Sequence, residues 1–259
     1  MIFDTLVLIA SILAGAVAAV SGFGIGSLLT PLLAVRYGTK LAVAVVSVPH
    51  LVGTAARFAT MKQHVDRKVF WRFGIFSAAG GLAGAVLNAR IQSPALSVVF
   101  GGLLIFAGIS GLTGLAEKMN FGRTAAWVAG GTSGFFGGLV GNQGGIRSAA
   151  LLGFDVSKEA FVATATAVAL IVDGARMPVY FVNQTAAIMH AWVEIAIGIA
   201  GVLAGTFGCG SLCIKLNRYA LSRTCDDEAP AIAAGVTTRL FDVSDLVALL
   251  VESESQEAA

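Results

Sequence analysis

Apolar segments separated by short polar or glycine-rich stretches occupy most of the first 208 residues of the chain. A helix needs about 20 apolar residues to cross the hydrocarbon layer of a membrane. Two segments, 25–36 and 144–154, are too short for this, and each follows a full-length segment and a cluster of glycines. The pattern predicts an all-α, polytopic integral membrane helix bundle with segments at about 3–21, 25–36, 41–60, 70–90, 96–115, 124–140, 144–154, 160–182 and 188–208.

The composition agrees with a membrane protein. Hydrophobic residues make up 56% of the chain and charged residues 12%, with a mean hydropathy of +0.84, whereas soluble domains carry about 25% charged residues. The formal net charge is only +2, and the basic residues lie in short loops rather than in one patch. We therefore expect the lipid bilayer as a partner and no nucleic acid. The sequence carries no signal for the oligomeric state.

The two halves of the chain resemble each other. A shift of 119 residues aligns glycines, apolar residues and a rare arginine without a gap, and a shift of 121 extends the match through a rare tryptophan. The aligned pairs include Gly22 with Gly141, Gly26 with Gly145, Val43 with Val162, Arg57 with Arg176, Trp71 with Trp192 and Gly80 with Gly201. We predict an internal duplication, with a first transmembrane repeat at 1–118, a second at 119–208 and an atypical tail at 209–259.

The basic loops predict the orientation of the two repeats. Lysine and arginine gather at 61–72, at 118–123 and at 215–223, which the positive-inside rule assigns to the cytoplasm. Counting segments from these loops places the connection at 37–40 outside and its counterpart at 155–159 inside. The repeats are therefore expected to be inverted. Inverted repeats with broken helices are typical of secondary transporters, whose substrate sites lie near the membrane midplane.

The two glycine clusters read GFGIGS from residue 22 and GNQGGIR from residue 141. A helix breaks at membrane depth only where protein or a watery cavity satisfies its backbone. The half-helix after each break directs its positive N-terminal end at the break, and an arginine there suits a small anion. The alternative is that these glycines only let helices pack closely. The candidate substrate-binding residues are Gly22, Gly24, Gly26, Ser27, Gly141, Asn142, Gln143, Gly144, Gly145, Arg147 and Thr166.

A glycine-rich broken helix is followed in one half by Pro31–Leu33 and in the other by Ala150–Leu152, and then by an alanine-rich helix that ends at a basic loop. Over about residues 5–208 this arrangement resembles the TauE/SafE family of membrane permeases. The resemblance implies a secondary transporter that exports small anions, such as sulfite, organosulfonates or related organic acids, across the bacterial inner membrane without ATP hydrolysis. Where such proteins often carry a glycine-rich phrase in both halves, this chain has Phe23 and Ile25 in one and Asn142 and Gln143 in the other.

Several polar residues inside the segments have two interpretations each. His50 and Arg57 share a helix face, and His50 is either functional or a satisfied packing residue. Arg57 and Arg176 either reach the membrane interface or line the site. Asp173 lies one turn before Arg176 and is placed to neutralise it. The hydroxyls of Ser47, Thr164 and Thr166 either face the site or bond to their own helix. The glycines expected to serve helix packing are Gly80, Gly84, Gly198, Gly201 and Gly205.

Other chemistry has little support in the sequence. The GFGIGS phrase has no strand before it and the chain has no Walker lysine, so we expect neither a nucleotide cofactor nor an enzyme. His190 and Glu194 have a metal-pair spacing but no third ligand, and no metal is expected. Cys209, Cys213 and Cys225 fit free thiols. The alternatives are a permease for another small solute and a non-transporting membrane protein, a degenerate copy with a disrupted C-terminus.

The tail breaks the repeat pattern. The counterpart of the segment 96–115 falls at about 217–236, where the chain carries Arg218, Arg223, Asp226, Asp227 and Glu228. Charges at the bilayer centre cost several kcal/mol in total. We expect no ordinary membrane span after about residue 209 and a tail in the cytoplasm.

Overall fold

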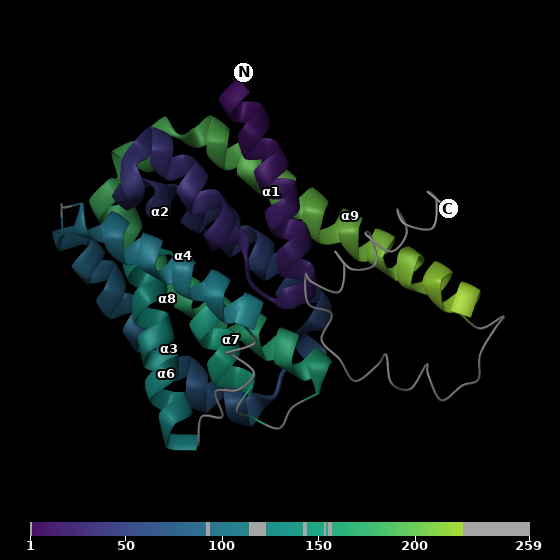
Figure 1. Ribbon diagram of the computed structural model, residues 1–259. Coiled ribbons are helices and arrows are strands. Elements are labelled where there is room, and N and C mark those ends of the chain that lie inside the picture. Colours follow the sequence, from purple (N-terminus) through teal and green to yellow (C-terminus); the bar gives the residue numbers. More distant parts are fainter. Residues whose placement is uncertain are drawn as a thin grey trace. The chain divides into compact units, whose positions relative to one another are not determined.

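The computed structural model describes residues 2–91, 94–113, 123–141, 144–152, 154 and 157–224 of the chain. In this part every regular element is helical, which confirms the all-α class (Figure 1). The elements are α1 (Ile2–Ser21), α2 (Ile25–Met61), the 3-10 turn η1 (Lys62–His64), α3 (Arg67–Arg90), α4 (Ala95–Thr113), α6 (Arg123–Val140), α7 (Gly144–Leu152), α8 (Lys158–His190) and α9 (Trp192–Thr224).

The chain divides into two compact units, Met1–Ser211 and Leu212–Ala259. The described part of the second unit is the end of α9, up to Thr224. The charged stretch around Asp226–Glu228, on which the expectation for the tail rests, lies outside the described residues.

Four helices of the described residues are long and apolar enough to cross a membrane. They cover Ile2–Ala19, Ile25–His64, Arg67–Arg90 and Glu159–His190, and the shorter apolar helices Ala95–Ile109 and Trp192–Gly208 accompany them. These helices overlap the apolar segments of the sequence, with 25–36 and 41–60 joined in α2, and the short segment that begins at residue 144 forms α7. The match follows from hydropathy, because each segment must remove its backbone polar groups from lipid by forming a helix.

Capping residues and backbone breaks set the helix limits. Asp66 begins α3 by accepting hydrogen bonds from the amides of Lys68, at 2.8 Å, and Val69, at 3.0 Å. Inside α2, Gly38 has φ 75° and ψ 156°, which divides α2 at the connection expected at 37–40. Inside α8, Gln184 has φ −136° and ψ 25°, which divides α8 where the sequence placed the end of its segment.

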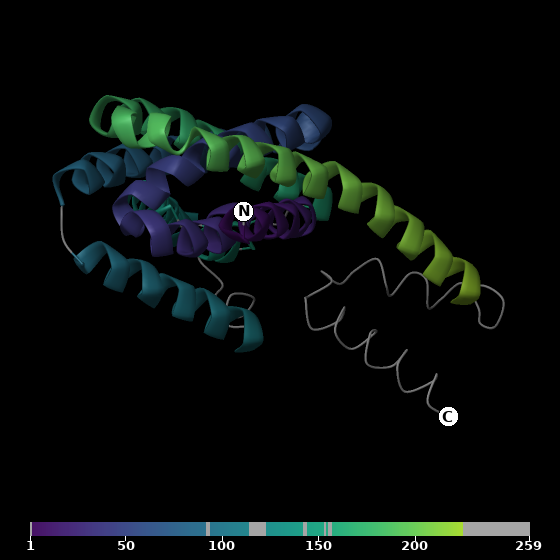
Figure 2. The ribbon, with the colours of Figure 1, turned by 90° about the horizontal axis from the view of Figure 1, so that it is seen from above.

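Glycines bring two pairs of helices into backbone contact. A methyl group added to Gly84 of α3 would overlap the carbonyl oxygen of Phe135 in α6, and one added to Gly205 of α9 would overlap that of Ile12 in α1. Figure 2 shows the first part of α9, in green, running over α1, in purple. Gly80 and Gly201 make similar approaches, so the packing role expected for these four glycines is confirmed.

Helices α2 and α8 pack against each other and carry most of the buried polar residues. Val43 and Ala44 of α2 share an apolar cluster with Tyr180 and Ile188 of α8. A second cluster joins Phe73 of α3 to residues of α7 and α8, among them Leu151, Phe161 and Val168. The polar residues of α2 and α8 therefore lie on helices that also take part in buried apolar clusters.

Contacts between the two halves occur in exchanged pairs. A methyl group added to Gly22 would lie 3.7 Å from a methyl carbon of Val162, and one added to Gly141 would lie 3.4 Å from a methyl carbon of Val43. The 119-residue shift converts Gly22 to Gly141 and Val43 to Val162. The second contact is therefore the first with the two halves exchanged. A methyl group added to Gly53 would contact a methyl carbon of Val202, and one added to Gly81 would contact a methyl carbon of Val172. The shifts of 119 and 121 residues convert the first of these contacts into the second.

Candidate functional site

Each half of the chain has a backbone break between two helices. Gly22 and Gly24, with φ 79° and 130°, separate α1 from α2, and Gly141, with φ 76°, follows α6. Glycine adopts such angles without the steric cost that other residues incur. The amide of Gly22 still donates to the carbonyl of Ala18 at 3.0 Å, and that of Gly141 to Gly137 at 3.0 Å, so both helices end in the same way.

The two breaks lie against each other. A methyl group added to Gly26 would overlap the carbonyl oxygen of Gly141, and one added to Gly144 would lie 2.5 Å from the ring of Phe23. Side chains are thus excluded at both positions. The structure thus brings Gly26 against Gly141, and Gly144 against Phe23, whereas Gly22 lies against Val162 and Ala165 of α8. Gly24 lies against Val17, Ser27 is half-buried in the first turn of α2, Gly145 lies in the first turn of α7, and Asn142 and Gln143 lie outside the described residues.

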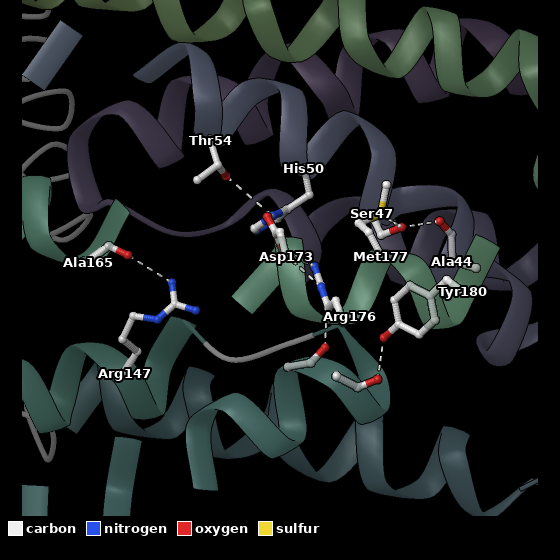
Figure 3. A network of polar contacts seen from close by, with 12 residues as sticks. Ala44, Ser47, His50, Thr54, Arg147, Ala165, Asp173, Arg176, Met177 and Tyr180 are labelled. Carbon is white, nitrogen blue, oxygen red and sulfur yellow. Dashed lines mark hydrogen bonds and ion pairs between the residues drawn. The ribbon is translucent and has the colours of Figure 1, made fainter. Parts of the chain in front are cut away.

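Arg147 extends from α7 to α8 beside the breaks, and only 2% of its surface is exposed. Its Nη1 donates to the carbonyl oxygen of Ala165 at 3.3 Å (Figure 3). Within the described part of the chain, its Nε and Nη2 and the Oγ1 of Thr166 have no hydrogen-bond partner. A methyl group added to Gly22 would lie 3.8 Å from the Cβ of Ala165. Arg147, Thr166 and the first break therefore meet around Ala165.

A second polar group joins α2 to α8 around the fully buried carboxylate of Asp173. Its Oδ2 lies 2.6 Å from Nδ1 of His50, and its Oδ1 lies 2.9 Å from Nε and 2.7 Å from Nη2 of Arg176. Figure 3 shows these three side chains pointing toward one another. The ion pair expected between Asp173 and Arg176 is confirmed, and the partner of His50 is now identified.

Arg176 also holds the end of α6 that leads into the second break. Its Nη1 donates to the carbonyl oxygen of Gly137 at 2.5 Å, and the hydroxyl of Tyr180 donates to that of Gly138. A cation is favourable at this position because the C-terminal end of a helix carries a partial negative charge. Arg176 is thus satisfied by groups of the protein.

Arg57 is buried in the interior of the protein, with 4% of its surface exposed, and Arg176 has 1% exposed. The interpretation of these two arginines as residues that reach the membrane interface is therefore wrong. Within the described residues, Nε and Nη1 of Arg57 have no hydrogen-bond partner. Arg57 lies two turns after His50 on α2, which runs antiparallel to α8, so it faces the turn of Ala165 and belongs to the same polar region.

The remaining polar candidates have partners of their own. Ser47 donates to the carbonyl oxygen of Ala44 at 2.5 Å and lies 3.0 Å from the sulfur of Met177. Thr164 accepts from the amide of Asp66 at 3.0 Å. Glu194 accepts from the hydroxyl of Tyr37 at 2.7 Å and pairs with Arg36 at 3.1 Å, while His190 is exposed. These residues are therefore bonded to other protein groups or, like His190, exposed, and none of them is a candidate for binding the ligand.

The sequence marked Arg57 as a candidate but did not show that its guanidinium is unpaired. The signal was present in the repeat, because the shift that aligns Arg57 with Arg176 also aligns Thr54 with Asp173. The first half thus has a threonine where the second half has the acid that neutralises its arginine. The sequence does not predict the contact between His50 and Asp173, because that contact depends on how α2 packs on α8.

Comparison with known proteins agrees with the membrane architecture. A family model described as sulfite exporter TauE/SafE matches residues 7–223. A comparison with curated proteins found no match, and neither did one with solved structures. The family match covers far more than half of the 259 residues. The chain therefore belongs to the TauE/SafE family of membrane transporters, as a multi-pass membrane protein.

Proposed function

We propose that this protein is a secondary transporter that exports a small anion, such as sulfite, an organosulfonate or a related organic acid, across the bacterial inner membrane. The observation that carries the proposal is Arg147, whose guanidinium is buried beside the two breaks. Within the described residues, two of its nitrogens have no hydrogen-bond partner. A buried charged donor without a partner costs several kcal/mol, and an anion that accepts from it removes this cost.

The surroundings of Arg147 favour an anion over a cation. Helices α2 and α7 begin at Ile25 and Gly144, next to the breaks, and their N-terminal ends carry partial positive charge. The stretches 22–27 and 141–147 contain no acidic residue. A cation would therefore find no carboxylate there. We propose that the anion contacts residues of both stretches together with Thr166.

We infer that the halves 1–118 and 119–208 are inverted repeats that move against each other around this site. The exchanged contacts of Gly22 with Val162 and of Gly141 with Val43 support a two-fold relation. The loop charges support an axis in the plane of the membrane. Transporters of this kind expose a central site to each side of the membrane in turn. For the tail at 209–259 we propose a cytoplasmic position with no ordinary membrane span.

Substitution of Arg147 tests the proposed function. Flux of sulfite, sulfonates and carboxylates is measured in proteoliposomes for the parent, Arg147→Gln and Arg147→Lys. Arg147→Gln is expected to weaken anion binding by about 1.5 to 3 kcal/mol, or roughly 10- to 150-fold, the range for a hydrogen bond to a charged group. Arg147→Lys keeps the charge but loses the planar fork, so it retains part of the activity.

The control is Arg72→Gln, which removes an exposed arginine of α3 and is expected to leave flux unchanged. Anion flux that is equal in Arg147→Gln and the parent would show that Arg147 serves packing. If only a neutral solute or a cation moves, the protein is a permease of another kind. If nothing moves, the non-transporting alternative replaces the proposal.

A further inference from the structure

We propose that the site takes a compact oxyanion with two negative charges, and that Arg57 is its second guanidinium ligand. This inference rests on the proposed function and assigns the charge of the substrate. It starts from the buried and unsatisfied state of Arg57. Four per cent of this side chain is exposed, and within the part of the chain described, its Nε and Nη1 have no acceptor.

The counterpart of Arg57 in the second half shows how the protein satisfies a buried arginine by itself. Arg176 receives two contacts from Asp173, three residues before it, and a carbonyl oxygen from Gly137. Three residues before Arg57 the chain has Thr54, which is neutral and lies 3.5 Å from Nδ1 of His50. Because the first half has threonine where the second half has an acid, the positive charge of Arg57 is available for a ligand.

Arg57 and Arg147 come from different halves of the chain and converge on one turn of α8. Because α2 and α8 run antiparallel, Arg57, two turns after His50, faces the turn that contains Ala165. The carbonyl oxygen of Ala165 accepts from Nη1 of Arg147. Like charges in a medium of low dielectric constant repel strongly. An anion that contacts both guanidinium groups removes this repulsion and supplies their missing acceptors. Each planar fork can take two oxygens of one oxyanion, so a single ligand with three or more oxygens can serve both.

The charge balance of the region selects the charge of the ligand. Among the described buried residues, the charged groups here are Arg57, Arg147, Arg176 and Asp173, because Glu194 is paired separately with Arg36. By formal charge, these three guanidinium groups face one carboxylate, and an excess of two positive charges remains. A dianion cancels the excess, whereas a monoanion leaves one charge buried without compensation. The chemical class is therefore a small dianion, such as the sulfite dianion or a short dicarboxylate.

The test compares anions of matched shape and different charge at one pH. The pairs are malonate with monomethyl malonate and sulfite with methanesulfonate, at a pH where malonate and sulfite are doubly ionised. Flux and competition are measured in proteoliposomes of the full-length parent, Arg57→Gln and Thr54→Asp. Thr54→Asp gives Arg57 the acidic partner that Arg176 already has, so it lowers the excess charge without removing the arginine.

The parent is expected to prefer the dianion of each pair. Both variants are expected to lose roughly tenfold or more of that preference, the effect of one charge-assisted hydrogen bond. An unchanged preference in both variants, or a parent that prefers monoanions, would overturn the inference and leave anion transport intact. Failure of the parent to move any anion would overturn the proposed function as well. Arg57→Lys, which keeps the charge, is expected to keep the preference.

Discussion

Asp173 is the residue on which the buried polar group depends most. Its carboxylate is fully buried and contacts both His50 and Arg176, which come from different helices. Removal of one partner from a buried ion pair leaves the other charge without compensation. The stability of the bundle and the geometry of the site are therefore linked through this one side chain.

The variant Asp173→Asn tests this link. It keeps the shape of the side chain but removes its charge, and we expect a loss of about 3 to 5 kcal/mol in the free energy of unfolding. The measurement is thermal unfolding in detergent, compared with Arg72→Gln, which removes an exposed charge of α3. Such surface substitutions usually change the free energy of unfolding by about 0.5 kcal/mol or less. Equal melting temperatures for the two variants would contradict the role given to Asp173.

At the residue scale the sequence predicted local relations and missed distant ones. Asp173 and Arg176 are one turn apart on a helix, so their spacing alone predicts the pair. His50 and Asp173 are 123 residues apart, and their contact exists only because α2 packs on α8. The burial of Arg57 also depends on that packing. From the sequence, Arg57 was expected at the membrane interface because it lies near the end of an apolar segment.

At the scale of elements, the helix limits expected from the sequence agree more closely with the structure, because hydropathy and the backbone angles of glycine depend on local sequence. The breaks at Gly22, Gly38 and Gly141 all occur at glycines with positive φ, in stretches that the sequence marked as interruptions. The end of α9 differs. The apolar segment was expected to end at 208, whereas the described helix continues to Thr224. Hydropathy reports burial in lipid and not the backbone hydrogen bonds that extend a helix beyond it.

The glycine contacts between α3 and α6 lead to a prediction at this scale. Gly84→Ala would place a methyl group on the carbonyl oxygen of Phe135, so the two helices must separate and the melting temperature is expected to fall. The matched control is Gly102→Ala in α4, where nothing lies within 4 Å of the added methyl group. Alanine is favoured over glycine in a helix by about 1 kcal/mol, so this control is expected to stabilise the protein. A rise in melting temperature for both variants would argue against close packing of α3 and α6.

For the whole molecule, the exchanged contacts and the loop charges predict that equivalent loops lie on opposite sides of the membrane. Single cysteines at Lys40 and at Ser157, in a chain whose three native cysteines are serine, test this with a reagent that does not cross membranes. Labelling from outside is expected for Lys40→Cys, and labelling only after permeabilisation for Ser157→Cys. Labelling of both from the same side would contradict the inverted arrangement.

In the proposed transport cycle, the buried guanidinium of Arg147 binds the transported anion where the two breaks meet. The most direct measurement is an experimental structure of the full chain with selenite, an analogue of sulfite whose selenium is located by anomalous scattering. We expect a selenium peak within hydrogen-bonding reach of Arg147, close to Ala165 and between the glycine breaks. A protein that transports selenite but shows its selenium elsewhere, with Arg147 in contact only with protein groups, would contradict this role of Arg147.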